Sequence, residues 1–255
     1  MVSFPHAAAL SGTHPPLSFI SSQIGEAEVF MDLYIVRHGN PNYMTDSLTE
    51  LGHRQAKAAA QELVKLGIDE IYSSPMGRAK ETAQYLCELC GLEMKIEPWA
   101  HETEHYGEDG HGGITHAVQM DPTFLRSPEV EAMGDRWVTH PAFRGEKEIT
   151  EMVKTVEDGA RDFLARLGYE LEGNRFRITE ANDKNVVLFC HAGMFLVLTA
   201  FLLRMPQLTA WHSFFMYQTG ITRCNFYNYD SGYTVGRYLW INDTHHLKKE
   251  GIELT

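Results

Sequence analysis

Residues 33–39 of the chain read Leu-Tyr-Ile-Val-Arg-His-Gly. The apolar, β-prone run 32–36 is typical of a short buried parallel strand, and it ends directly at Arg37, His38 and Gly39. Polar residues that follow such a strand lie where open α/β sheets bind their ligands. This stretch therefore predicts an α/β fold with a site that begins at residue 37.

Helices and strands alternate in the segments that follow. Small and apolar residues recur at helical spacing over 49–66, where Ser47 and Glu50 match a capping box and Gly67 suits the helix end. A strand is expected over 68–73, a helix from Pro75 to about residue 90 with Gly91 as its stop, and a weak strand over 93–99. The order predicts parallel strands with helical connections.

An interruption separates these elements from the rest of the chain. Roughly sixty residues, about 99–161, are rich in Gly, His and acidic side chains and interrupt the alternation of strands and helices. A helix is expected over 150–167, so it overlaps the end of this region. We expect them to form a cap inserted into a single domain of residues 31–255. A strand (185–189), an apolar helix (194–203) and two aromatic β-rich segments (221–229 and 233–240) complete a three-layer helix, mixed sheet and helix fold.

The first thirty residues differ from this domain. They contain no Lys or Arg and three Pro, and they lack the basic start and the unbroken apolar run of a signal peptide. We expect a poorly ordered N-terminal extension. Met31 stands directly before the first strand, which makes it an alternative start of translation.

Composition excludes some classes of partner. The 255 residues include 22 Lys and Arg against 34 Asp and Glu, so the net charge of −12 opposes binding to nucleic-acid phosphates. The uncharged run 186–203 is broken at 190–193, so it is interpreted as strand, turn and helix rather than as a membrane span. Four scattered Cys favour a reducing, cytoplasmic location. The oligomeric state stays open.

Three positions combine into a candidate anion site. Arg78 lies in the first turn of its helix and His191 just before the next helix, so backbone N–H groups at the positive helix ends add to both side chains. His38 is the candidate nucleophile, because imidazole attacks phosphorus at neutral pH while arginines spread the charge. This chemistry requires no metal and no cofactor, and we expect none.

Four motifs in order carry a resemblance to a known family. They are Leu-Tyr-Ile-Val-Arg-His-Gly (33–39), Leu-Thr (48–49) with Gly52 and Gln55-Ala56, Ser-Ser-Pro-Met-Gly-Arg-Ala-Lys-Glu-Thr-Ala (73–83), and Phe-Cys-His-Ala-Gly (189–193). Together they resemble the histidine phosphatase, or phosphoglycerate-mutase-like, superfamily. Residues 239–247 are similar to the C-terminal segment of that family, so the resemblance covers most of 31–247.

The resemblance implies a phosphohistidine mechanism. His38 would take the phosphoryl group, Arg37, Arg78 and His191 would hold its oxygens, and water would then attack. Ala192, which follows His191, belongs to the same expected phosphate-binding group.

A proton donor is also implied, because the leaving oxygen must be protonated. In the family this acid is a Glu after the third strand, and Glu102 of Trp-Ala-His-Glu (99–102) occupies the similar position. Glu104, two residues later, is the reserve choice. The family often has an Asn six residues after the nucleophile, but Met44 stands there, so Asn40 or Asn42 would have to make that phosphate contact.

These features favour a metal-independent phosphomonoester hydrolase (EC 3.1.3 class) acting on a small phosphorylated metabolite. The extended signatures of cofactor-dependent mutases are absent, so a phosphoglycerate-type mutase is the first alternative, and a catalytically silent phospho-ligand sensor is the second. Residues 101–160 hold thirteen acidic and five basic residues, which disfavours polyanionic substrates. No metal site is expected, since the spacings of His101, His105, His111 and His116 fit no zinc pattern.

Overall fold

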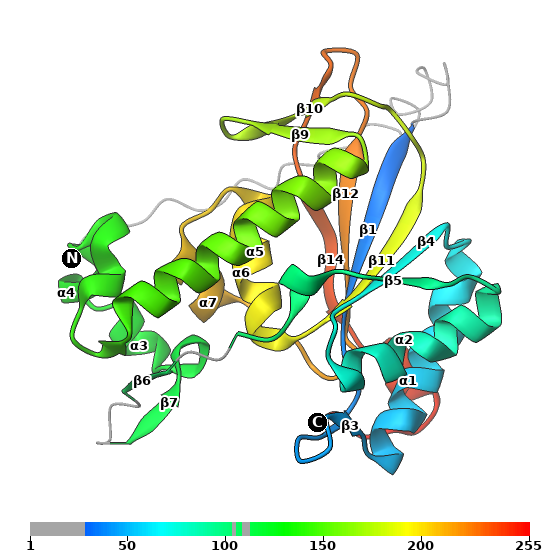
Figure 1. Cartoon of the computed structure of the whole chain (residues 1–255), viewed down its shortest axis with the longest axis horizontal. Helices are drawn as coiled ribbons and strands as arrows, with labels where there is room; N and C mark the ends of the chain where they lie inside the picture. Colours follow the sequence, from blue (N-terminus) through cyan, green and yellow to red (C-terminus); the bar gives the residue numbers. More distant parts are fainter. Residues whose placement is uncertain (1–28, 104–105, 109–112) are drawn as a thin grey trace, which may run out of the picture.

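The computed structural model describes residues 29–103, 106–108 and 113–255, so nearly all of the predicted N-terminal extension lies outside the described residues. A six-stranded sheet in the order β14-β12-β1-β11-β4-β5 forms the centre (Figure 1). Its strands are β1 (Phe30–Arg37), β4 (Glu70–Ser73), β5 (Met94–Ile96), β11 (Asn185–Cys190), β12 (Ile221–Tyr227) and β14 (Arg237–Asp243). Because β1, β11, β4 and β5 are parallel while β12 is antiparallel to β1 and β14, the predicted mixed sheet is confirmed.

Alternate residues of β1 point to opposite faces of the sheet. Leu33 and Ile35 pack with the core beneath α5 (Glu146–Arg166) and α6 (Ala192–Leu203). Tyr34 and Val36 pack on the other face, which α1 (Glu50–Leu63) and α2 (Gly77–Cys90) cover (Figure 1). The predicted helix, sheet and helix layers are therefore confirmed.

The ends of the helices follow local backbone chemistry. Thr49 caps α1, since its side chain accepts a hydrogen bond from Gly52 N at 3.1 Å. The predicted capping by Ser47 is wrong, because Ser47 pairs as part of β3 (Ser47–Leu48) with β2 (Pro41–Asn42). As expected, α1 and the 3₁₀ turn η2 (Val64–Leu66) stop at Gly67 and α2 stops at Gly91, with φ of 66° and 69° in the left-handed region.

The uncharged run 186–203 folds as β11, a turn at His191 and α6, as interpreted from the sequence. α6 is buried on nearly every side, which explains its apolar composition without a lipid environment. No helix in the described part of the chain combines the length and the apolar character that crossing a membrane requires.

The region predicted as a cap forms small elements of its own (Figure 1). They are η3 (Pro98–Ala100), β6 (Tyr106–Glu108), β7 (Ile114–His116), η4 (Ala117–Gln119), α3 (Pro122–Leu125), α4 (Pro128–Glu131), η5 (Gly134–Thr139) and β8 (Phe143–Arg144). Strands β7, β6 and β8 make a three-stranded sheet. Trp99 fits against α5 at Gly159, where a Cβ atom would lie 2.1 Å from the indole ring. The cap segment thus starts from a fixed contact with α5.

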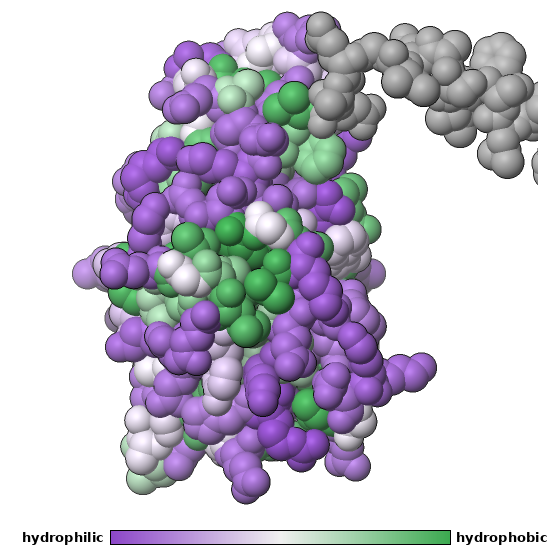
Figure 2. All heavy atoms as spheres, turned by 90° about the vertical axis from the view of Figure 1, so that its right-hand side faces the viewer, coloured by the Kyte–Doolittle hydropathy of each residue, from purple (hydrophilic) through white to green (hydrophobic). Residues whose placement is uncertain are grey.

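Several elements have no counterpart in the sequence prediction. They are β9 (Tyr169–Glu172), β10 (Arg175–Ile178), α7 (Gln207–Ser213) and α8 (His245–Lys249). Strands β9 and β10 form a small sheet with β13 (Tyr233–Thr234), which lies at the start of the predicted β-rich segment 233–240. Figure 2 views the side of the molecule on which α1, α2 and β5 lie, and shows a largely hydrophilic surface whose largest apolar patch lies near the middle.

Candidate active site

Three strand ends meet at one edge of the sheet. Arg37 at the end of β1 pairs in register with Cys190 of β11, and Phe189 pairs with Ser73 of β4. The residues that follow these strands, His38, His191 and Ser74, are therefore brought together. All three are buried, and the rings of His38 and His191 have centroids 5.0 Å apart.

The backbone sets the tautomer of His38. Its Nδ1 lies 2.7 Å from the carbonyl oxygen of Gly39 and so carries the proton, while Nε2 accepts from Arg78 Nε at 3.3 Å. Burial, together with the nearby charges of Arg37 and Arg78, lowers the pKa of His38 to about 3. His38 is thus a neutral imidazole with an unprotonated Nε2, the form that acts as a nucleophile.

Arg78 is held by the start of its own helix and by the loop between β2 and α1. Its Nη1 lies 2.5 Å from Oδ1 of Asp46, whose Oδ2 accepts from Gly77 N at 2.6 Å. Burial of Asp46 opposes its ionisation, but these hydrogen bonds and the Arg78 charge outweigh burial and lower the pKa of Asp46. The Asp46 carboxylate thus bonds with the Arg78 guanidinium and with the N-terminus of α2, two groups that also suit a bound anion.

Arg37 and His191 retain unused polar atoms. Arg37 Nη1 donates to the carbonyl of Met216 at 2.6 Å, but its buried Nε meets no acceptor among the described residues. His191 Nε2 lies 2.7 Å from Ser74 Oγ, whereas its Nδ1 is buried and lacks a partner in the described part of the chain. Burial lowers the pKa of both groups. Buried polar atoms left without partners indicate room for a ligand that completes their hydrogen bonds.

Glu102 is anchored to the first turn of α6. Its Oε1 accepts from Thr103 N at 2.9 Å and from Met194 N at 3.0 Å. The segment before it is fixed by Glu97, which accepts from Trp99 Nε1 at 2.6 Å and pairs with Arg166 of α5. The Glu102 carboxylate thus lies beside the helix start that follows His191.

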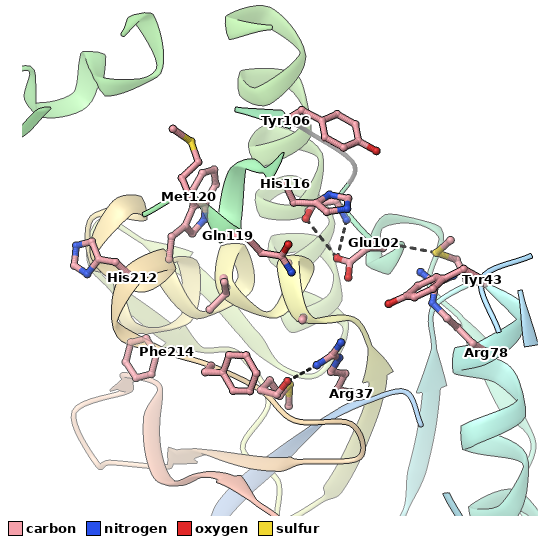
Figure 3. Close-up of a pocket in the computed structure, with 18 of the residues that line it drawn as sticks. Arg37, Tyr43, Arg78, Glu102, Tyr106, His116, Gln119, Met120, His212 and Phe214 are labelled. Atoms are coloured by element: carbon pink, nitrogen blue, oxygen red, sulfur yellow. Dashed lines mark hydrogen bonds between the residues drawn. The ribbon is translucent and has the colours of Figure 1, made fainter. Parts of the chain in front are cut away.

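A cavity of about 1000 Å³ opens beside Arg37, Arg78 and Glu102 (Figure 3). His38 and His191 are buried and are not among the described residues that line it. Arg37, Arg78 and Glu102 line one end of it, and Ala192 lies there at the first residue of α6. The other end is lined by Met120 of the cap and by Phe214 after α7. The arrangement can bind a phosphoryl group by its oxygens and leave space for an organic substituent.

The remaining predicted contacts are placed elsewhere. Asn40 bonds through Oδ1 with Thr49 Oγ1 at 2.8 Å, and Asn42 Oδ1 accepts from Met44 N at 3.1 Å. Neither residue is among the described residues that line the cavity, and their phosphate contact stays a prediction. Glu104, the reserve acid, lies outside the described residues.

Sequence reasoning missed Asp46, Ser74 and Thr82. Thr82 donates to Arg78 O at 2.7 Å and accepts from Gly39 N at 3.0 Å, so it links the start of α2 to the nucleophile loop. Its spacing of four residues from Arg78 was the available signal, since such residues share a helix face. Ser74 directly follows β4, the strand that pairs with β11, and His191 follows β11. Its position at a strand end was therefore a signal for Ser74. Among the described residues no group of three His, Cys, Asp or Glu side chains forms a metal-binding cluster.

Solved structures share this architecture. A phosphoserine phosphatase from Entamoeba histolytica, in complex with 3-phosphoglyceric acid, is 23% identical, with a TM-score of 0.57 and coverage of 85% of this chain and 99% of that one. A mycobacterial glucosyl-3-phosphoglycerate phosphatase in complex with VO3 is 24% identical, with a TM-score of 0.55 and coverage of 86% and 100%. At these identities the likeness concerns the fold.

A sequence relative and a family model refine the picture. A probable phosphoglycerate mutase from Yersinia pestis (strain Pestoides F) is 39% identical over a 77-residue alignment that covers 27% of this chain and 36% of that protein. The chain thus matches only about a third of the length of this relative. The model of the histidine phosphatase superfamily (branch 1) matches residues 33–235, which is more than half of the chain. The resemblance noted in the motifs is confirmed, and the chain belongs to the histidine phosphatase superfamily.

Proposed function

We propose that the protein is a metal-independent phosphomonoester hydrolase that works through a phosphohistidine on His38. One observation carries the proposal. The unprotonated Nε2 of His38 lies beside Arg78, while Arg37 Nε and His191 Nδ1 are buried nearby without partners among the described residues. Arg78, Arg37 and His191 can donate to the oxygens of a phosphoryl group bonded to Nε2 of His38.

The first step transfers the phosphoryl group. Nε2 of His38 attacks phosphorus, the bond between phosphorus and the ester oxygen breaks, and the protonated carboxyl group of Glu102 gives its proton to the leaving alcohol. The guanidinium groups of Arg37 and Arg78 stabilise the charge on the equatorial oxygens. They thereby perform the charge stabilisation that a metal ion supplies in other phosphoryl-transfer sites.

The second step returns the site to its starting state. The Glu102 carboxylate takes a proton from water, the oxygen of that water attacks phosphorus, and the bond between phosphorus and Nε2 breaks. Inorganic phosphate leaves, His38 is again neutral and Glu102 is again protonated. The position of Glu102 at the start of α6 supports these roles, because the Thr103 and Met194 N–H groups hold its carboxyl group at the cavity that also exposes Arg37 and Arg78.

The experiment is phosphate release from p-nitrophenyl phosphate and from metabolite phosphates in the presence of EDTA. The wild type is expected to turn over, and His38→Ala to lose activity while keeping its circular dichroism spectrum. Intact-mass spectrometry during turnover is expected to show one added phosphoryl group, absent in His38→Ala. Activity abolished by EDTA and restored by a metal would contradict the metal-independent mechanism.

A phosphoglycerate-type mutase is the second candidate, favoured by the short stretch of 39% identity to a probable phosphoglycerate mutase. The same phosphohistidine would then give its phosphoryl group to a second hydroxyl group rather than to water. Incubation with 3-phosphoglycerate separates the two functions, because a hydrolase yields inorganic phosphate and glycerate, whereas a mutase yields the isomeric monoester.

A further inference from the structure

The cavity is much larger than the phosphoryl group that its charged end accommodates. Its volume of about 1000 Å³ is at the upper end of the range typical of pockets for organic ligands. The substituent of the phosphate ester therefore meets most of the cavity wall. The chemistry of that wall determines which substituents bind.

Much of the remaining cavity wall is apolar and rich in aromatic rings. It is formed by Met120, Leu196, Trp211, Phe214, Phe215 and Met216. Figure 3 shows Met120 and Phe214 on the side away from Arg78.

This wall is backed by further aromatic contacts. The ring of Trp211 lies edge-on to that of Trp137 at 5.1 Å, and the ring of Phe214 lies edge-on to that of Tyr238 at 6.4 Å. Trp211 and Phe214 thus pack within or against the hydrophobic core, which holds this part of the wall in shape in the absence of a ligand.

Charge is distributed unevenly along the cavity. Among the described lining residues the only Arg or Lys side chains are Arg37 and Arg78, and both lie at the phosphoryl end. At the far end, burial and the neighbouring Arg126 lower the pKa of His212. Arg126 donates to the His212 ring at 3.1 Å and to Ser213 Oγ at 3.2 Å, and it is not among the described residues that line the cavity. A carboxylate on the substituent would therefore leave water without a cationic side chain in the described lining at that end.

The cap side of the cavity adds flat surfaces. Tyr106 and His116, which face each other across the pair β6 and β7, stack with ring centroids 4.9 Å apart and an interplanar angle of 29°. Both residues line the cavity. Ring faces accept another flat, apolar group more favourably than a hydrated acid.

We propose that the substrates of this site are phosphate monoesters of apolar, aromatic alcohols that carry no second anionic group. The inference rests on the proposed hydrolase function and narrows its substrate class. The proposed substrates differ from the compounds in complex with two structural neighbours, because both phosphoserine and 3-phosphoglyceric acid carry a carboxylate.

Comparison of benzyl phosphate with phosphoserine and 3-phosphoglycerate tests the proposal. All three esters release an alkyl alcohol, so the ease of departure of the leaving group does not decide the comparison. The expected kcat/KM is at least about tenfold higher for benzyl phosphate, the difference that apolar pocket contacts typically produce. Equal or higher kcat/KM for either acid, with activity that depends on His38, would overturn the substrate class but leave the hydrolase function intact.

A matched pair of variants places the effect in the cavity. Phe215 lines the cavity and is 61% exposed, while Leu239 of β14 is 52% exposed and is not part of the described lining. Phe215→Lys is expected to lower kcat/KM for benzyl phosphate and to raise it for phosphoserine. Leu239→Lys introduces the same charge and is expected to change neither value. Identical effects of the two variants would contradict the assigned wall.

Binding of unreactive phosphonates gives a readout that does not need turnover. Titration calorimetry of the wild type is expected to show tighter binding of benzylphosphonate than of phosphonoacetate or methylphosphonate. If no ester is hydrolysed but this order holds, the hydrolase function fails and the ligand class stands. If the three phosphonates bind equally, or phosphonoacetate binds best, the ligand class is wrong.

Discussion

The Nε atom of Arg78 lies 3.3 Å from the Nε2 atom of His38. The two residues come from different elements, since His38 follows β1 and Arg78 lies in the first turn of α2. Thr82 connects these elements by its hydrogen bonds to Gly39 N and Arg78 O. A fixed guanidinium next to a buried imidazole keeps that imidazole neutral, so the fold itself prepares the nucleophile.

The neutral state of His38 predicts how stability depends on pH. His38 has a folded-state pKa of about 3 against an ordinary value of 6.5, and burial similarly lowers the pKa of His246 to about 4. Below pH 6.5 the unfolded chain binds protons that the folded protein does not, so the stabilisation present above pH 6.5 is lost as pH falls toward 4. Each such histidine contributes a slope of about 1.4 kcal/mol per pH unit.

Urea unfolding between pH 6 and pH 4.5 measures this slope. His38→Gln removes one titrating group and is expected to make the pH dependence shallower by about 1.4 kcal/mol per unit. His246→Gln, at a buried position beyond the cavity lining, is expected to change the slope in the same direction. An unchanged slope in His38→Gln would show that this imidazole is protonated in the folded protein.

Glu102→Gln tests the proton donor by its dependence on the leaving group. Gln keeps an oxygen that can accept from Thr103 N and Met194 N, so the loop is expected to stay in place. General acid catalysis contributes about 10²–10⁴-fold, and an alkyl phosphate should lose this factor in kcat/KM, which covers the steps up to phosphoryl transfer and excludes the later action of Glu102 on water. p-Nitrophenyl phosphate, whose leaving group needs no proton, should lose far less. Equal losses for both substrates would remove Glu102 from the role of acid.

The central part of the site could be predicted because it follows directly from the pattern of strands and helices. Arg37, His38 and His191 each stand at the end of an apolar strand, and Arg78 stands at the start of a helix. The parallel register of β1, β11 and β4 then brings these positions together without any further information. Site residues that stand at strand ends can therefore be predicted from the sequence.

The position of Asp46 was not predictable in the same way. It depends on the turn between β2 and β3, where Asp46 has a positive φ of 49°, and on the approach of Gly77, where a Cβ would lie 2.1 Å from Asp46 O. Contacts between segments that are distant in sequence, such as that of Asp46 with Gly77, leave no local periodicity. The hairpin of β9 and β10 differs, because Gly173 and Asn174 between its strands were a local turn signal that sequence reasoning overlooked.

Asp46→Asn is expected to strengthen binding of phosphate. In the structure the Asp46 carboxylate uses Arg78 Nη1 and Gly77 N, two donors that suit a phosphoryl oxygen. Removing its charge eliminates this competition, and a partly exposed ion pair of about 0–1 kcal/mol corresponds to a several-fold lower KM. Inhibition constants for inorganic phosphate and vanadate are expected to fall with KM. A higher KM with a lower kcat would instead assign Asp46 to the positioning of Arg78.

Gly193→Ala tests the contact between α6 and the loop that carries Glu102. A Cβ at this position would lie 2.1 Å from Thr103 Oγ1 and 2.9 Å from Glu102 Oε1, so the loop must move. We expect kcat to fall about tenfold or more, because small displacements of a reacting group have large effects. The change in unfolding free energy should stay within about 2 kcal/mol, since the better helix propensity of Ala offsets part of the overpacking.

The double variant Gly193→Ala with Thr103→Ala separates displacement of the acid from general damage to the fold. Removing Thr103 Oγ1 eliminates the shorter of the two clashes and leaves the Thr103 N–H that donates to Glu102. We expect the double variant to regain part of the lost kcat and kcat/KM on an alkyl phosphate, with Thr103→Ala alone as its control. Because the clash acts through Glu102, kcat/KM for p-nitrophenyl phosphate, whose leaving group needs no proton, should vary less across the series. A double variant less active than Gly193→Ala would mean that Thr103 Oγ1 supports the site rather than obstructing the new methyl group.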